Sequence, residues 1–142
     1  MRVLALDHGA ARCGVAISDP TGTLATPLAT VERPDSRRGL AALAGIADER
    51  GVERVVVGLP LTLRGEEGAQ AGEARAFAAR LAARLTAPVE LFDERLTTRQ
   101  AVRTGGTADL DSRAAAHLLE AYLARPSPAR ELAGDAVPVE RP

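Results

Sequence analysis

The sequence predicts an α/β fold with a mixed five-stranded sheet flanked by helices. Three short apolar runs come first and are separated only by turns, which is typical of an antiparallel start. After them, strand-like and helix-like segments alternate, and a strand–helix–strand connection makes its two strands parallel. At 142 residues with 46% hydrophobic content, the chain is long enough for one domain with one core.

The antiparallel start consists of three predicted strands. Residues 3–6 form a buried strand that ends at Asp7, and residues 13–18 form the second strand of a hairpin. Residues 24–31 have the pattern of a third strand. Pro27 within it indicates an edge position or a local irregularity, because proline cannot donate to a strand ladder.

Helices and strands alternate in the middle of the chain. Asp35 is a good N-cap for a helix over about residues 36–50. Residues 55–57 form the continuous apolar run that is typical of a central parallel strand with both faces buried. A second helix is predicted over residues 69–85, and the fifth strand over residues 89–92.

The C-terminal part is predicted to hold one more long helix and a tail. The helix covers about residues 112–124, with Asp111 at its first turn. Four prolines follow this helix, which favours an extended chain over packed structure. We therefore expect one domain over residues 1–124 and an extended or disordered tail over residues 125–142.

Several chemically active side chains are assigned structural roles. Cys13 and Tyr122 are expected in the core, since no histidine is paired with the thiol in the sequence. A lone histidine beside a turn, as His8 is, is more often incidental than a ligand or a base. His117 falls off the apolar stripe of the last helix and is expected to be solvated.

Composition excludes several classes of protein. A net charge of −1 and a pI near 6.1 exclude a generic polycation, so a polyanion would have to bind to a local group of basic residues. All 18 basic residues are arginine. One cysteine permits no internal disulfide and no multi-cysteine zinc cluster. Only 2% of residues are aromatic, which argues against base stacking as the main contact. The N-terminal apolar run is too short for a signal peptide or a membrane span, and we expect a cytoplasmic protein.

Three acidic residues form the candidate site. Asp7 follows the first strand and Glu94 the fifth, and ligands of such sheets collect at the carboxyl ends of parallel strands. With Asp111, these carboxylates are natural ligands for two Mg²⁺ or Mn²⁺ ions, which activate water and stabilise the leaving oxygen in phosphodiester hydrolysis. Structural roles stay open for each acid: Asp7 and Asp111 as caps, and Glu94 as an ion-pair partner of a nearby arginine.

Five segments, in this order and spacing, resemble the YqgF/RuvX family: LDHG (6–9), RCGVAISDP (12–20), VGLPL (57–61), DERLTT (93–98) and LDS (110–112) with Ala115. The resemblance implies an RNase H-like fold related to Holliday junction resolvases. It also implies metal-dependent nuclease activity and a role in maturing the 5′ end of pre-16S rRNA. By motif position, the acidic catalytic and metal-binding residues of the family correspond to Asp7, Glu94 and Asp111.

The substrate-binding candidates lie in two regions. In the first, at the turn after the first strand, Gly9 and Arg12 are retained, while Ala10 and Ala11 replace the threonine and lysine that the family commonly has. This departure removes a hydroxyl and a cation, so it bears on the role of those two positions in substrate binding and not on the metal site. In the second, Arg95, Thr97 and Thr98 are the candidates.

Their chemistry allows two roles in each case. Arg95 binds phosphate through its fork or clamps Asp93 and its loop. Thr97 and Thr98 suit the cap of a short helix, whose N-terminus is then able to face a phosphate.

Four functions are compatible with these observations. An RNA nuclease acting on pre-rRNA, with ribosomal precursor particles as partners, is favoured. A Holliday junction resolvase would use the same chemistry on branched DNA. It needs a symmetric dimer for paired cuts, whereas a monomer is sufficient for RNA trimming. A sugar kinase or actin-like ATPase needs a second related domain for which the chain has no room, and the three acids argue against a non-catalytic ribosome-associated module.

Overall fold

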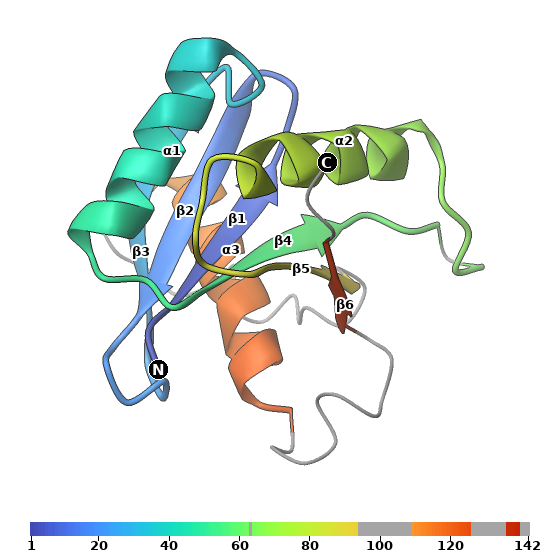
Figure 1. The fold of residues 1–142 in the computed structure, drawn as a ribbon. Coiled ribbons are helices and arrows are strands. Elements are labelled where there is room, and N and C mark those ends of the chain that lie inside the picture. Colours follow the sequence, from blue (N-terminus) through green and yellow to red (C-terminus); the bar gives the residue numbers. More distant parts are fainter. Residues whose placement is uncertain (63, 94–108, 126–135, 140–142) are drawn as a thin grey trace.

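The computed structural model describes residues 1–62, 64–93, 109–125 and 136–139. Within this part of the chain the strands form one six-stranded sheet in the order β3-β2-β1-β4-β5-β6. The strands are β1 (Val3–His8), β2 (Arg12–Ser18), β3 (Ala25–Glu32), β4 (Arg54–Leu59), β5 (Val89–Asp93) and β6 (Ala136–Pro138). The helices are α1 (Arg37–Glu49), α2 (Ala69–Ala82) and α3 (Leu110–Leu123). Figure 1 shows α1 and α2 on one face of the sheet and α3 on the other.

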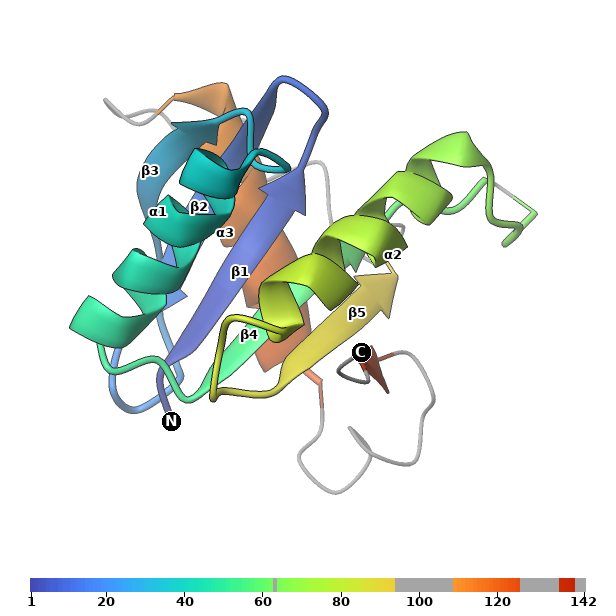
Figure 2. The same ribbon diagram turned by 45° about the horizontal axis from the view of Figure 1, so that its top comes forward.

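The strand directions confirm the predicted mixed sheet. β1, β2 and β3 pair antiparallel, and β4 lies parallel to β1 on one side and to β5 on the other. The predicted antiparallel start and the parallel strands after it are therefore both present. Because β1, β4 and β5 run in the same direction, their carboxyl ends meet at one edge of the sheet (Figure 2).

The edge strand β3 carries the irregularity that Pro27 predicts. Val15 pairs with Ala29, but Ala16 pairs with Pro27, so the register shifts and Leu28 is left between two pairs. A proline has no N–H to donate, and a bulge at an edge strand tolerates this loss.

The sixth strand differs from the prediction that everything after residue 124 lies outside the domain. Residues 136–138 are extended, as expected, but they pair antiparallel with β5, and the Val139 N–H donates to the Val89 carbonyl at 2.7 Å. Without this segment β5 would present a free edge of unpaired backbone groups. Pro138 is tolerated because an edge strand need not donate on its outer side.

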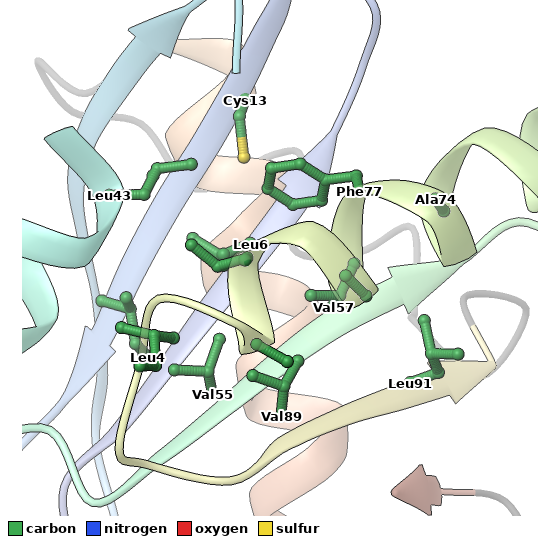
Figure 3. Packing of buried hydrophobic residues seen from close by; sticks show 14 of the residues in the cluster. Leu4, Leu6, Cys13, Leu43, Val55, Val57, Ala74, Phe77, Val89 and Leu91 are labelled. Atoms are coloured by element: carbon green, nitrogen blue, oxygen red, sulfur yellow. The ribbon is translucent and has the colours of Figure 1, made fainter. Parts of the chain in front are cut away.

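Side chains along the strands alternate between two cores. Leu4 and Leu6 pack under α1 and α2 in a large cluster that includes Phe77 (Figure 3). Val3 and Ala5 pack under α3 in a second cluster. Successive strand residues point to opposite faces. Asp7 therefore continues the α3 side of β1, and the next residue, His8, continues the side of α1 and α2.

The cap of α1 differs from the prediction by one residue, and Asp111 lies in the first turn of α3 as predicted. The side chain of Ser36, not Asp35, accepts the hydrogen bond from Gly39 N at the start of α1. At the start of α3 the cap is Asp109, which accepts from Ser112 N, while Asp111 lies in the first turn. In both places neighbouring residues are able to cap, and contacts with other elements decide between them.

The prediction that His117 is solvated is wrong. Its side chain is 5% exposed, and its Nδ1 lies 3.0 Å from the Glu120 carboxylate one turn later. The apolar stripe predicts only which side of α3 packs on the sheet. It does not predict other contacts of the helix, such as that of His117 with Glu120. Cys13 and Tyr122 are buried in the core, as predicted.

The helices of the described segments do not include one with the length and apolar character needed to cross a membrane.

Candidate active site

Asp7 lies near the carboxyl end of β1 and is half-buried. Its register partner on the neighbouring strand is Gly14. β4 and β5 end at the same edge of the sheet, where β5 stops at Asp93. Glu94 is the next residue in the chain, and it lies outside the described residues together with Arg95, Thr97 and Thr98. The structure thus places Asp7 where the sequence predicts it.

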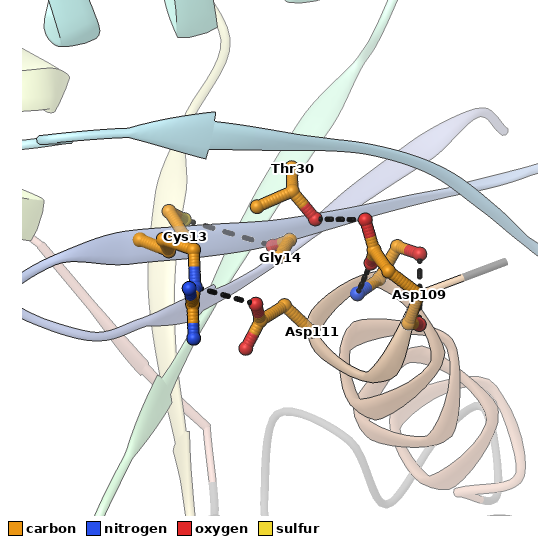
Figure 4. A network of polar contacts seen from close by, with 7 residues as sticks. Cys13, Gly14, Thr30, Asp109 and Asp111 are labelled. Atoms are coloured by element: carbon orange, nitrogen blue, oxygen red, sulfur yellow. Dashed lines mark hydrogen bonds and ion pairs between the residues drawn. The ribbon is translucent and has the colours of Figure 1, made fainter.

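The start of α3 crosses β2 directly over Gly14. A Cβ atom at this position would lie 1.8 Å from the Asp111 carbonyl oxygen, so only glycine permits the approach. Gly14 shares its face of the sheet with Asp7. Asp7 and Asp111 are therefore the neighbours of Gly14 on the α3 side, one through the strand register and one through the helix, and Asp111 lies beside β2 in Figure 4.

The position of α3 is fixed by Asp109. One carboxylate oxygen accepts from Ser112 N at 2.8 Å, and the other accepts from the Thr30 hydroxyl on β3 at 2.7 Å (Figure 4). The first bond caps the helix, and the second ties its start to the sheet. Hydrogen bonds from Ser112 and Thr30 lower the pKa of Asp109, because they stabilise the charged carboxylate.

We expect Asp109→Ala to destabilise the protein by about 1 kcal/mol at neutral pH, the usual cost of a lost N-cap. Because the folded pKa is lowered, this stabilisation is present above the unfolded pKa of about 3.9 and is lost as pH falls through the folded value. Urea unfolding at neutral and acidic pH measures the difference. Asp109→Asn is the control, since asparagine still caps but does not titrate; equal pH dependence in Asp109→Asn and wild type would contradict this interpretation.

Arg12 contacts the second acid. Its Nε lies 3.0 Å from the Asp111 Oδ2, and the two side chains are 61% and 37% exposed. An ion pair this exposed contributes little to stability, about 0–1 kcal/mol. The guanidinium therefore remains free to contact an anion. The turn that carries it is tight, with Gly9 N donating to the Arg12 carbonyl at 2.9 Å, and a Cβ at Gly9 would press against that oxygen.

The pKa of the Cys13 thiol is shifted by its surroundings. Burial raises the pKa of its thiol far above the ordinary value, and the negative charges of Asp7, Asp35 and Asp111 raise it further. The thiol is thus neutral and unreactive at physiological pH.

His8 and Asp35 form a pair that the sequence did not reveal. His8 is 3% exposed in its side chain, its Nε2 lies 2.8 Å from Asp35 Oδ2, and its ring stacks on Phe77 with centroids 4.4 Å apart. The pair joins the end of β1 to the loop before α1. Because His8 points away from the face of Asp7, it serves the scaffold rather than the acids. The two residues lie 27 positions apart, so no local pattern signals their contact.

Among the residues that the structure describes, no three His, Cys, Asp or Glu side chains form a cluster that could hold a metal ion. The described part of the chain supplies Asp7 and Asp111 to the candidate site. The third predicted acid, Glu94, is outside it.

Curated relatives are similar over nearly the whole chain. A protein of Chloroflexus aurantiacus named "Putative pre-16S rRNA nuclease" is 46% identical over 130 residues, which are 85% of each chain. Relatives with the same name occur in Moorella thermoacetica, at 44% identity over 88% of this chain and 96% of that one, and in Anaeromyxobacter dehalogenans, at 42% identity over 90% of this chain and 100% of that one.

Solved structures share the fold. Thermus thermophilus RuvC in complex with a Holliday junction substrate superposes with a TM-score of 0.64 at 17% identity, covering 97% of this chain and 99% of that one. The fold is therefore the RNase H-like fold of RuvC, as the sequence predicts. The family described as "RuvX: Holliday junction resolvase" matches residues 1–125, and the chain belongs to this family.

Proposed function

We propose that this protein is a divalent-metal-dependent nuclease that hydrolyses phosphodiester bonds of RNA in maturing the 5′ end of pre-16S rRNA. The observation that carries the proposal is the placement of Asp7 and Asp111 on one face of the sheet, on either side of Gly14, with Arg12 beside them. The names of the relatives at 42–46% identity support the choice of substrate. The proposed location is the cytoplasm, where ribosomal precursor particles would be the partners.

The donor set on this face fits Mg²⁺ or Mn²⁺. Asp7 and Asp111 offer only carboxylate oxygens, the ligands that hard divalent cations prefer. The nearby sulfur and imidazole donors, Cys13 and His8, belong to the opposite face of their strands. We propose Glu94, which directly follows β5, as the third ligand. Two bound ions would supply an activated water and stabilise the leaving oxygen.

The side chains of the chain itself then position the substrate. Asp7 is held on a central strand, and Asp111 on a helix whose start is tied to β3, so both carboxylates are preorganised. Arg12 is exposed beside Asp111 and offers its fork to a phosphate oxygen. Gly9 permits the tight turn that carries Arg12, and Arg12 contacts Asp111. Arg95, Thr97 and Thr98 are proposed as further substrate contacts.

A substrate panel tests the proposal. The protein is incubated with matched single-stranded RNA, single-stranded DNA, duplex and four-way junction substrates, with Mg²⁺ or Mn²⁺ and with chelator. Metal-dependent cleavage of RNA, absent in Asp7→Asn, is the expected result. Cleavage that persists in chelator, or that Asp7→Asn retains, would show that the nuclease activity does not use this site.

A second candidate function is resolution of Holliday junctions, which the description of the matching family favours. Paired cuts on a four-way junction need two active sites related by symmetry. Analytical ultracentrifugation with and without junction DNA separates the candidates. A monomer that trims RNA supports the first function, and a dimer that cuts the junction symmetrically supports the second.

Divalent metal is expected to raise the melting temperature of the wild-type protein. Carboxylates that share the proposed metal site would repel one another without metal, and ions that bind the folded state stabilise it by mass action. At a metal concentration about 100 times the Kd, the gain is about 2.7 kcal/mol. Differential scanning fluorimetry at millimolar Mg²⁺ or Mn²⁺ measures the shift. An equal shift in Asp7→Asn would mean that the ions bind elsewhere.

A further inference from the structure

A groove of about 580 Å³ lies between the end of the edge strand β3 and the first turns of α1. The strand side contributes Val31 and Arg33, and the helix side contributes Ser36, Arg38 and Ala42. Both arginine side chains are exposed. The groove is thus open to solvent and carries two guanidinium groups.

The groove begins beside the candidate active site. Arg33 N donates to the Ala11 carbonyl at 2.9 Å, which ties the groove to the turn between β1 and β2. Glu32, another residue of its wall, lies directly across from Arg12 in the register of β2 and β3. Arg12 in turn contacts Asp111. The groove lies on the α1 side of the sheet, and the turn that carries Arg12 separates it from the acids on the α3 side.

The cations of the groove have no acidic partner. In the described part of the chain, no ion pair involves Arg33, Arg38 or their neighbour Arg37. Glu32 directly precedes Arg33 and lines the groove, but among the described residues it forms no ion pair with these arginines, and Asp35 is bound by His8. Arg33 and Arg38 in the groove, and Arg37 beside Arg38 in the chain, are therefore available to an anion.

The positions of these arginines are unfavourable for the stability of the folded protein. Arg37 and Arg38 occupy the first turn of α1, which holds no acidic residue, and a cation there is repelled by the positive end of the helix dipole. Arg33 has φ of 48°, in the left-handed region that glycine adopts without steric cost. Strain and unfavourable charge at one place point to a binding role, which compensates the loss of stability.

The backbone that presents Arg33 is rigid. Its carbonyl accepts hydrogen bonds from Ser36 N at 3.0 Å and from the Ser36 hydroxyl at 2.7 Å. α1 packs so closely here that a Cβ at Gly39 would lie 2.2 Å from the same carbonyl oxygen. A rigid groove loses little entropy when a ligand binds.

We propose that this groove is a second phosphate-binding subsite, in which Arg33 and Arg38 hold the backbone of a single-stranded nucleic acid next to the cleavage position. The inference rests on the proposed nuclease function and extends it. Guanidinium forks suit phosphate oxygens, and contacts to phosphate are independent of base sequence. The low aromatic content agrees with binding through the backbone rather than through base stacking.

The test measures binding without cleavage, in the Asp7→Asn background, by fluorescence anisotropy with single-stranded RNA and DNA of the same sequence. Arg33→Gln with Arg38→Gln is expected to weaken binding of both polymers about tenfold. It should also lower the slope of log Kd against log salt by about 1.4, or about 0.7 for each lost phosphate contact. The control, Arg80→Gln with Arg84→Gln, removes the same charge from exposed positions near the C-terminal end of α2 and should bind as the parent does.

Thermal unfolding separates binding from folding, because loss of the groove arginines should leave the melting temperature unchanged or raise it. Equal affinities for the groove variant and the control, a loss confined to one polymer, or no binding by the parent would each overturn the assignment. If the parent binds both polymers through these arginines but the wild-type protein cleaves neither, the nuclease proposal fails and the subsite stands.

Discussion

Asp7→Asn is expected to abolish metal-dependent cleavage while leaving the fold intact. The change removes a ligand charge at the edge of the sheet and alters no core volume, because the two side chains have nearly the same shape. Metal-ion stabilisation of a phosphoryl-transfer transition state amounts to several kcal/mol. We therefore expect a rate loss of about 1,000-fold or more, measured as initial rates on single-stranded RNA in Mg²⁺.

Asp48→Asn is the matched control for this variant. Asp48 is exposed near the C-terminal end of α1, away from the acidic edge, so its substitution changes the net charge equally without touching the site. Both variants should unfold at the same urea concentration as the wild-type protein or higher. Wild-type rates in Asp7→Asn would mean that this aspartate does not hold the metal.

Gly14→Ala is expected to damage both stability and activity. The added methyl would lie 1.8 Å from the Asp111 carbonyl oxygen, and backbone on both sides cannot yield as a flexible side chain can. α3 must move off β2, which carries Asp111 away from Asp7 and opens the core that contains Leu118 and Leu119. Overpacking of this kind costs about 3 kcal/mol or more.

Urea unfolding and cleavage rates of the same preparation measure the two effects of Gly14→Ala together. Gly45→Ala is the control, because a Cβ at Gly45 meets no atom within 4 Å. Gly45 lies inside α1, where alanine should stabilise the helix by about 0.5–1 kcal/mol. A Gly14→Ala protein as stable and active as wild type would contradict the close contact of α3 with β2.

Much of the fold follows from local patterns. The continuous apolar run around Val56 predicted a central strand, and the strand lies between β1 and β5. Pro27 predicted an edge position or an irregularity, and β3 has both. Asp7 was placed correctly because the direction of parallel strands fixes the edge at which their ends meet. In each case the signal lies within a few residues of the feature.

The features that escaped prediction depend on contacts between distant segments. Asp109 caps α3, and Thr30, 79 positions away, binds the same carboxylate. The sequence around His8 indicates no partner, because Asp35 comes from a separate loop. The role of Gly14 is set by a helix nearly 100 positions later, which a single sequence does not indicate.

Mn²⁺ binding measured by isothermal titration calorimetry tests the proposed metal site most directly. The wild-type protein should bind Mn²⁺, and the control variant Asp48→Asn should bind it with the same affinity. Asp7→Asn and Asp111→Asn should each weaken binding at least about tenfold, since each removes a charged ligand. If both variants bind Mn²⁺ with wild-type affinity and stoichiometry, Asp7 and Asp111 do not form a metal site.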